Sequence, residues 1–156
     1  MKILAINKRA SFDYEILETY EAGLVLSGSE VKSIRQGQAS LKGSYVSLKV
    51  NSQGRVEAFL LQAHILPYKA AGLQPEYNSE RPRKLLLKKK ELSYLIGKKE
   101  EKGLTVIPIK LYTKRSFIKL EIALVRGKKL FDKREDLKKK DLDRQLRTLT
   151  KEKLRT

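Results

Sequence analysis

Apolar and polar residues alternate along most of the first 125 positions, a period-two pattern that is typical of half-buried β-strands. Turn-forming residues separate these stretches, so consecutive strands are expected to pair as antiparallel hairpins, the first of them with a turn around Gly23. Residues 1–11 form a short lead, and residues 67–82, which hold three of the four prolines, are expected to be a surface loop. The predicted strands cover residues 12–18 and 24–26, 45–50 and 55–65, and 104–112 and 117–125.

Two segments carry helical patterns instead. Ser27 and Glu30 have the spacing of a capping box, and Gly37 is a suitable C-terminal stop, which predicts a helix of about three turns between them. A second helix is expected between residues 88 and 103, where apolar residues recur at helical spacing. Residues 83–87 before it are compatible with a short strand or with the entry of that helix.

About six strands with two inserted helices predict a mainly β domain built on an antiparallel sheet. A small closed barrel is the simplest architecture, because closure removes the exposed strand edges that an open sheet leaves. We therefore expect a barrel of the oligonucleotide-binding (OB) type over residues 1–126. A split antiparallel sheet with both helices on one face is the alternative. Pro108, inside a predicted strand, indicates an edge position or a bulge.

The chain changes character around residues 125–135. Beyond them it contains neither glycine nor proline, and residues 126–156 carry 13 basic and 6 acidic residues. The leucines of this segment form a stripe that is too narrow and irregular to anchor a core helix. Residues 127–156 are therefore expected to be a basic C-terminal tail that is disordered or fraying alone in water and helical on binding.

The 35 basic and 18 acidic residues give a formal net charge of +17, which favours a polyanionic partner and makes nucleic acid the leading hypothesis. An anionic membrane surface comes next, weakened because the tail has no tryptophan and its only phenylalanine lies at the hinge. No stretch is long enough for a transmembrane span, and the N-terminus has too short an apolar core for a secretory signal. A cytoplasmic protein without a membrane partner is expected.

Candidate catalytic chemistry is sparse. The chain has no cysteine, which excludes thiolate zinc sites, disulfides and a cysteine nucleophile. The single histidine, His64, has no nucleophile at an informative spacing. The carboxylates of Asp13, Glu15, Glu18 and Glu21 leave a metal-dependent nuclease as a weak hypothesis, since acids on a basic protein more often pair with lysine or arginine. We expect no enzyme activity, no cofactor and no metal.

Basic residues are interleaved with apolar ones in three clusters, formed by Lys32 with Arg35, by residues 81–90 and by residues 110–119. No cluster is specific alone. Together on one barrel they predict a broad contact with folded RNA that is recognised by shape and phosphates rather than by base sequence. Three aromatic residues are candidates for stacking on bases, with packing in the core or rim as an equal alternative: Tyr45, Tyr112 and Phe117.

Several short motifs occur together and in register from about Asn7 to Arg134. They are Asn-Lys-Arg-Ala at 7–10, Glu-Thr-Tyr-Glu-Ala-Gly at 18–23, Glu-Val-Lys-Ser at 30–33, Arg-Lys-Leu-Leu-Leu at 83–87, Gly-Lys-Lys at 127–129 and Asp-Lys-Arg at 132–134. In this combination the chain resembles the small protein B family, the bacterial partners of transfer-messenger RNA (tmRNA, also called SsrA RNA). The resemblance implies an OB-type barrel with added helices and a tail that is disordered in free solution.

The resemblance also implies a function in ribosome rescue, or trans-translation. The barrel is expected to bind the tRNA-like domain of tmRNA and to deliver it to ribosomes stalled on messages without a stop codon. The tail is expected to enter the small-subunit decoding centre and the empty mRNA channel and to become helical there. A monomer suits this role. A structural ribosomal protein and a general binder of structured RNA are the alternatives.

The resemblance points to individual residues as well. Asn7, Glu21 and Leu86 match family positions that matter for RNA binding, and neighbouring basic and aromatic residues extend this set. Some members carry histidine where this chain has Phe131, which keeps a stacking surface but loses the imidazole hydrogen bond. The expected RNA-binding residues are Asn7, Lys8, Glu21, Lys32, Arg35, Lys84, Leu86, Tyr112, Lys114 and Lys119. The expected tail residues are Gly127, Lys128, Lys129, Phe131, Asp132, Lys133 and Arg134.

Overall fold

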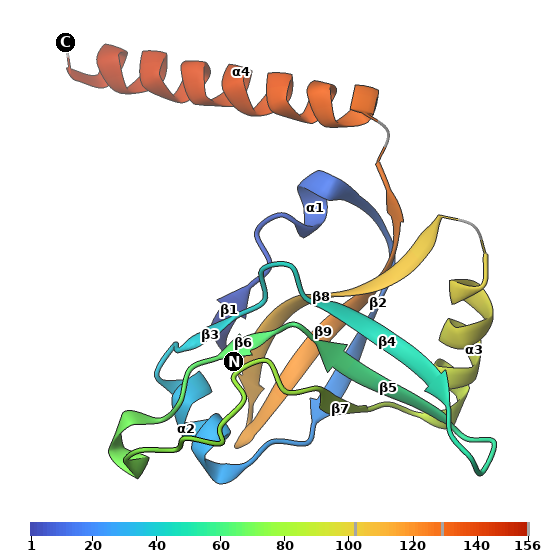
Figure 1. The fold of residues 1–156 in the computed structure, drawn as a ribbon. Helices are drawn as coiled ribbons and strands as arrows, with labels where there is room; N and C mark the ends of the chain where they lie inside the picture. Colours follow the sequence, from blue (N-terminus) through green and yellow to red (C-terminus); the bar gives the residue numbers. More distant parts are fainter. Residues whose placement is uncertain (102, 129, 156) are drawn as a thin grey trace.

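The protein is built on one seven-stranded antiparallel sheet, seen here in a computed structural model that describes residues 1–101, 103–128 and 130–155 (Figure 1). Two short strands, β3 (Ala39–Ser40) and β6 (His64–Ile65), pair separately. In spatial order the main sheet consists of β1 (Lys2–Ile6), β8 (Leu104–Lys114), β9 (Phe117–Gly127), β2 (Tyr14–Leu24), β7 (Arg83–Leu86), β5 (Val56–Leu61) and β4 (Tyr45–Val50). A mainly β, antiparallel fold is thus confirmed.

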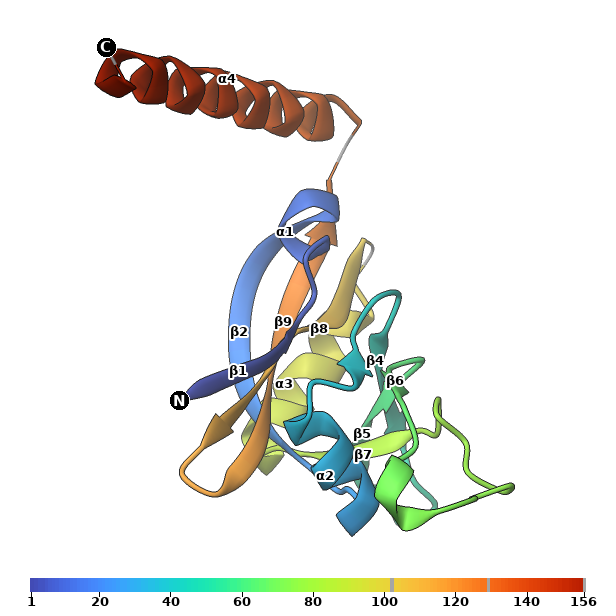
Figure 2. The ribbon, with the colours of Figure 1, turned by 90° about the vertical axis from the view of Figure 1, so that its left-hand side faces the viewer.

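The sheet curls strongly but does not close, so the predicted closed barrel is wrong. Among the described residues the edge strand β1 pairs only with β8, and the opposite edge strand β4 pairs only with β5. Curling brings β4 close to β8, but β3 lies beside β1, where a closing strand would have to pair. Figure 2 shows how the long strands β2, β8 and β9 bend, which gives the sheet its curled shape.

The core fills the inside of the curl. Two helices contribute to it: α2 (Gly28–Arg35) through the fully buried Ile34, and α3 (Lys89–Lys99) through the fully buried Leu95. A second, smaller cluster packs on the other side of the sheet, where Ala10 of α1 (Ala10–Asp13) covers β8 and β9. Strand β9 is therefore buried on both faces at this end, which fixes the point from which the C-terminal segment leaves the sheet.

The N-terminal part differs most from its prediction. Residues 1–11 are not a mere lead, because β1 occupies the sheet edge, and Phe12 lies in α1 rather than in a strand. The predicted turn around Gly23 is wrong as well, since β2 runs through it without interruption. Gly23 lies between Lys119 and Leu86, and a Cβ there would be 3.3 Å from the Leu86 Cβ. The glycine permits close strand approach rather than a turn.

Other local predictions are confirmed. The capping box is present, because the Glu30 N–H donates to Ser27 Oγ and the Ser27 N–H donates to Glu30 Oε1. Gly37 follows with φ +76°, the left-handed conformation that glycine adopts without steric cost. The hairpin of β4 and β5 forms, although β5 ends at Leu61 and not at residue 65. Of the two alternatives for residues 83–87, the strand is the one observed, over 83–86, and the register shifts between Pro108 and Lys110 as a bulge. The 67–82 loop contains only the 3-10 turn η1 (Lys69–Ala71).

A single 26-residue helix, α4 (Leu130–Arg155), follows the sheet and stands away from it (Figures 1 and 2). Its leucines at 137, 142, 146, 149 and 154 are all exposed, in agreement with the prediction that this stripe does not anchor a core. Whether the segment is disordered alone in water stays a prediction. None of the helices in the described part of the chain is long and apolar enough to span a membrane.

Candidate nucleic-acid interface

Strand alternation places several predicted RNA-binding residues on one surface, the outward side of strands β7, β2, β9 and β8, which we call the outer sheet face. Leu86 lies beside Gly23, Gly23 beside Lys119, and Lys119 beside Tyr112. Leu86 is 53% exposed despite its position in a strand. The face contains Glu21, Lys84, Leu86, Lys110, Tyr112, Lys114, Phe117, Lys119 and Glu121.

A carboxylate at the centre of this face is held by two neighbours from β8. The Tyr112 hydroxyl donates to Glu21 Oε2, and Lys114 Nζ lies 3.3 Å from Glu21 Oε1. The hydrogen bond from Tyr112 and then the nearby lysines lower the pKa of Glu21. Glu21 therefore stays ionised on a basic surface and presents fixed acceptor oxygens. It lies within β2, and not at the turn predicted for it.

Tyr112 supports this carboxylate and is itself covered. Its side chain is only 6% exposed, and Lys110 Nζ lies 5.7 Å from its ring centre. Burial and, after it, the hydrogen bond to Glu21 raise the pKa of Tyr112, so the hydroxyl remains a donor. Tyr112 thus positions Glu21, whereas Phe117 is 67% exposed at the end of the same face, with Lys119 Nζ 5.9 Å from its ring centre.

The remaining predicted RNA-binding residues lie elsewhere. Asn7 follows β1, and its side-chain amide donates to the Pro108 carbonyl at 2.9 Å. Lys8 follows it and is exposed. On α2, Lys32 Nζ lies 5.5 Å from the centre of the Tyr68 ring. Arg35 donates to the Ser116 carbonyl at 2.9 Å, which ties α2 to the β8–β9 turn near the outer sheet face.

The junction between β9 and α4 is held against α1. The Lys128 N–H donates to the Asp13 carbonyl at 3.0 Å, and Lys128 Nζ donates to the Ser11 carbonyl at 2.7 Å. Lys128 Nζ also pairs with Asp136, whose pKa this hydrogen bond lowers. Lys133 Nζ lies 3.4 Å from Asp13 Oδ1. We call Ser11, Asp13, Lys128, Lys133 and Asp136 the junction cluster.

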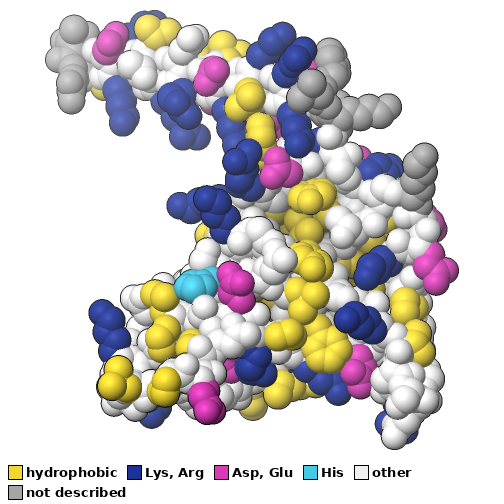
Figure 3. All heavy atoms as spheres, viewed as in Figure 1, with side chains coloured by type: hydrophobic (Ala, Val, Ile, Leu, Met, Phe, Trp, Pro, Cys, Tyr) yellow, Lys and Arg dark blue, Asp and Glu magenta, His cyan; other side chains and the backbone are white. Residues whose placement is uncertain are grey.

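Only part of the predicted tail set is described. Gly127 ends β9 opposite Tyr14, and Arg134 is exposed on α4. Lys129 lies outside the described residues. Phe131 and Asp132 belong to α4, but their side chains lie outside the described part as well. Lys and Arg side chains line the helix with hydrophobic side chains between them, as the blue and yellow spheres of Figure 3 show.

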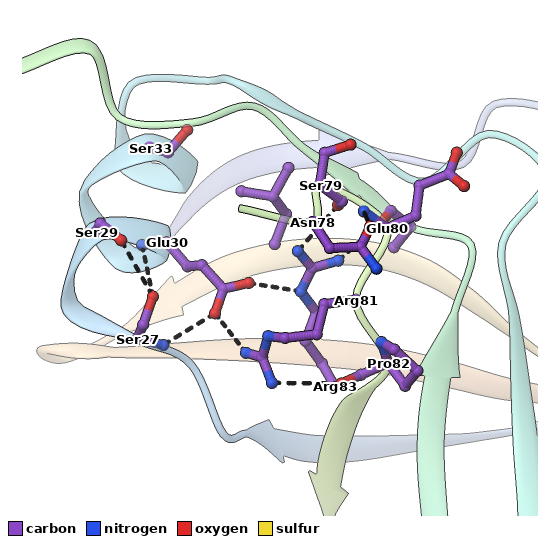
Figure 4. A network of polar contacts seen from close by, with 12 residues as sticks. Ser27, Ser29, Glu30, Ser33, Asn78, Ser79, Glu80, Arg81, Pro82 and Arg83 are labelled. Carbon is purple, nitrogen blue, oxygen red and sulfur yellow. Dashed lines mark hydrogen bonds and ion pairs between the residues drawn. The ribbon is translucent and has the colours of Figure 1, made fainter. Parts of the chain in front are cut away.

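Sequence reasoning missed a buried ionic network beneath the 67–82 loop (Figure 4). Glu30 and Arg83 are 1% and 0% exposed, and Arg83 Nε lies 2.7 Å from Glu30 Oε2. Arg81 donates to the other Glu30 oxygen, and Arg83 also donates to the Ala63 and Ser79 carbonyls at 2.8 and 3.0 Å. Arg83 is thus removed from the basic surface predicted for residues 81–90. The only signal of this network in the sequence was Glu30, an acid at a helix-capping position.

Burial would by itself raise the pKa of Glu30. Hydrogen bonds from the Ser27 N–H, Arg81 and Arg83 outweigh this effect and hold the pKa below its ordinary value of 4.5. Glu30 therefore remains charged and locks α2 to the end of the loop. The network shapes the scaffold beside the outer sheet face, and its buried members Glu30 and Arg83 are not accessible to a ligand.

The carboxylates considered for a nuclease are dispersed. Asp13 faces Arg9 and Lys133, and Glu21 faces Tyr112 and Lys114. Glu18 accepts hydrogen bonds from the Tyr20 and Tyr94 hydroxyls on another side of the molecule. Within the described residues no group of histidines and carboxylates has the arrangement of a metal site. Asp13, Glu18 and Glu21 are thus each engaged by a cation or a hydroxyl.

Comparison with known proteins gives consistent results. The model of the family described as "SmpB protein" matches residues 4–152. The "SsrA-binding protein" of Nitratiruptor sp. is 52% identical over 153 residues, covering 97% of this chain and 99% of the relative. That of Trichodesmium erythraeum is 46% identical over 151 residues, covering 97% and 94%. A chain in the solved structure "tmRNA-SmpB: a journey to the center of the bacterial ribosome" superposes with a TM-score of 0.64 at 44% identity, covering 83% of this chain and 87% of that one.

Proposed function

Because this chain belongs to the SmpB protein family, we propose that it binds tmRNA through its tRNA-like domain and brings it to stalled ribosomes for trans-translation. The outer sheet face is the observation that carries the proposal. It combines lysines, an exposed leucine and a fixed ionised carboxylate on a rigid surface of a chain with net charge +17. This is an RNA-binding adaptor, and no step of its action requires bond chemistry by the protein.

The outer sheet face offers three kinds of contact to folded RNA. Lys84, Lys114 and Lys119 supply cations for phosphates, a contribution that makes affinity depend on salt. Leu86 supplies apolar surface for a ribose or base. Glu21 accepts hydrogen bonds from base N–H or ribose hydroxyl groups, which discriminates RNA from a simple polyanion. The curled antiparallel sheet that carries these residues is, in our proposal, an opened variant of the OB-type fold.

The second part of the proposal concerns the division of labour. Residues 1–126 hold the RNA, and residues 127–156 act on the ribosome, where α4 enters the decoding centre and the empty mRNA channel. A basic helix with exposed leucines that stands off the body suits a channel lined by ribosomal RNA. Action on ribosomes places the protein in the cytoplasm.

Affinity for RNA tests the proposal directly. The labelled tRNA-like domain of tmRNA and a random RNA duplex of equal length are titrated with the protein at physiological salt. We expect clear preference for the tRNA-like domain. If about five phosphates are contacted, a fourfold increase in salt lowers affinity by roughly a few hundredfold. Equal affinity for both RNAs would overturn the proposal.

A structural ribosomal protein is the competing function. Such a protein is present on all ribosomes in equal amounts, whereas an adaptor is substoichiometric and enriched on stalled ones. Quantitative mass spectrometry of ribosomes, purified with and without induced stalling, separates these outcomes. Sequencing of the RNA that copurifies with the protein identifies its ligand independently.

A further inference from the structure

A cleft of about 900 Å3 opens where the two edges of the curled sheet fail to meet. One wall is the end of β1 with the following turn, and the other is the connection from β3 into β4. The start of β8 forms the floor between them. The lining comprises residues 5–10, 13–14 and 39–45 together with Thr105 and Ile107.

The cleft has an apolar floor and a basic rim. Ala10, Leu41 and Ile107 are buried and give it an apolar base. Lys8 and Lys42 are exposed at the rim, and neither has a side-chain ion pair with any described residue. A lysine without a carboxylate partner, beside an apolar cavity, is suited to an anionic group of a ligand.

An aromatic ring and unpaired backbone complete the site. Tyr45, the first residue of β4, lines the cleft and is 39% exposed. Among the strands that the structure describes, β1 and β4 are the two edges of the main sheet, and such edges present backbone N–H and C=O groups to a partner. The cleft thus offers stacking, backbone hydrogen bonds and positive charge side by side, and its volume lies within the range of about 300–1,000 Å3 of small-molecule pockets.

We propose that this cleft receives one unstacked nucleotide of the bound RNA. The base lies against Leu41 and Ile107 with the Tyr45 ring beside it, and its phosphate lies at Lys8 and Lys42. Unpaired loop nucleotides are the usual targets of such pockets, because a base inside a helix cannot reach an aromatic ring. The inference rests on the proposed RNA-binding function and adds a second contact point at the start of β8, at the opposite end of that strand from Tyr112 and Lys114.

The main competing occupant is an extended peptide that adds to the edge of β1 or β4. The charge of the rim favours RNA, since Lys8, Arg9 and Lys42 face a single acid, Asp13, which already pairs with Arg9 at 3.6 Å. We therefore assign the site to a nucleotide and let the experiment exclude the peptide.

Four single variants of the full chain test the assignment by fluorescence anisotropy with the labelled tRNA-like domain of tmRNA. Tyr45→Ala is expected to weaken binding about tenfold, and Tyr45→Phe, which keeps the ring, less than about twofold. Lys42→Ala is expected to weaken binding and to reduce the slope of log affinity against log salt by about 0.9. Lys69→Ala in the exposed turn η1 removes the same charge outside the cleft lining and should leave that slope unchanged.

Photocrosslinking gives an independent readout. Ultraviolet crosslinks from the peptide containing Tyr45 should fall on a nucleotide that is unpaired in the RNA, and a crosslink to a base-paired nucleotide would overturn the inference. If the wild type prefers the tRNA-like domain but Tyr45→Ala and Lys42→Ala bind it as tightly as the wild type does, the assignment of a nucleotide to the cleft is wrong while the proposed function stands. If the wild type shows no preference, the proposed function itself fails. Thermal melting of each variant verifies that the fold is intact.

Discussion

The sheet body and helix α4 are both basic, but they hold their charged and apolar groups in opposite ways. On the body, cations and acids are paired across strands, as Lys114 with Glu21 and Lys110 with Glu121 at 3.6 Å. On α4, leucines lie exposed between lysines and arginines that are mostly exposed as well. A rigid surface suits recognition of one RNA shape, whereas a solvated helix gains its contacts only inside a partner.

Removal of α4 gives the largest expected effect. A chain ending at Gly127 keeps the sheet and the outer sheet face, so we expect wild-type affinity for the tRNA-like domain within about threefold, because the proposed division of labour assigns the lost lysines to the ribosome and not to that RNA. Peptide tagging on stalled ribosomes should be abolished. Anisotropy and an in vitro tagging assay measure the two activities separately. Normal tagging by the truncated chain would show that the helix has no role on the ribosome.

Breaking the buried network should destabilise the body alone. Arg83→Ala leaves the buried Glu30 carboxylate without one of its two cations, which costs about 3–5 kcal/mol in unfolding free energy. The matched change Arg147→Ala on α4 should alter the unfolding free energy by less than about 0.5 kcal/mol. Urea denaturation measures both, and equal costs would contradict the contrast between a fixed and a solvated arginine.

Two leucines of nearly equal exposure separate the functions of the two regions. Leu86 on the body is 53% exposed and Leu146 on α4 is 54% exposed. Leu86→Ala should weaken binding to the tRNA-like domain about fivefold, because apolar surface buried by RNA is lost. Leu146→Ala should leave that affinity unchanged and lower tagging. The reverse pattern would mean that the leucine stripe of α4 contacts tmRNA.

Acid should affect the body through Glu30. Its pKa in the folded protein lies below the ordinary 4.5, so its contribution to stability is complete above pH 4.5 and is lost as the pH falls through the folded-state value. Urea midpoints measured between pH 7 and pH 3 should fall more steeply for the wild type than for Glu30→Gln, which has no proton to gain at this position. Parallel curves would assign the acid sensitivity to other groups.

The junction cluster gives the smallest effect. Asp13→Asn removes the carboxylate that faces Lys133, a partly exposed pair worth less than about 1 kcal/mol. Because the chain has no cysteine, spin labels on Ser52→Cys and Thr148→Cys report the distance between body and helix cleanly. We expect a broader distance distribution for Asp13→Asn and an unchanged one for the control Asp143→Asn. Identical distributions would show that α4 is oriented without the Lys133–Asp13 pair, by the hydrogen bonds of Lys128 to Asp13 and Ser11.

Local sequence patterns predicted the elements whose stabilising contacts are also local. The Ser27–Glu30 capping box depends on residues three apart, and the hairpin of β4 and β5 and the bulge at Pro108 depend on strands that follow each other directly along the chain. The exposed leucine stripe of α4 was also predictable from sequence, because leucines spaced this irregularly cannot pack together as one buried face of a helix. The family motifs likewise placed Glu21, Leu86 and Lys84 among the RNA-binding candidates before their common surface was known.

Properties that depend on distant segments required the folded chain. Gly23 resembles a turn residue in sequence, and only Leu86, some sixty positions later, shows that it permits strand contact. Arg83 resembles its basic neighbours in sequence, and only the folded structure shows that it is buried and paired with Glu30. Whether the sheet closes into a barrel could not be predicted from the sequence either, since it depends on where β3 lies relative to β1. Composition and short-range pattern thus establish most of the elements, the charge and the family. The strand order, the burial of charged side chains and the gap between the two sheet edges arise from long-range packing that no local pattern encodes.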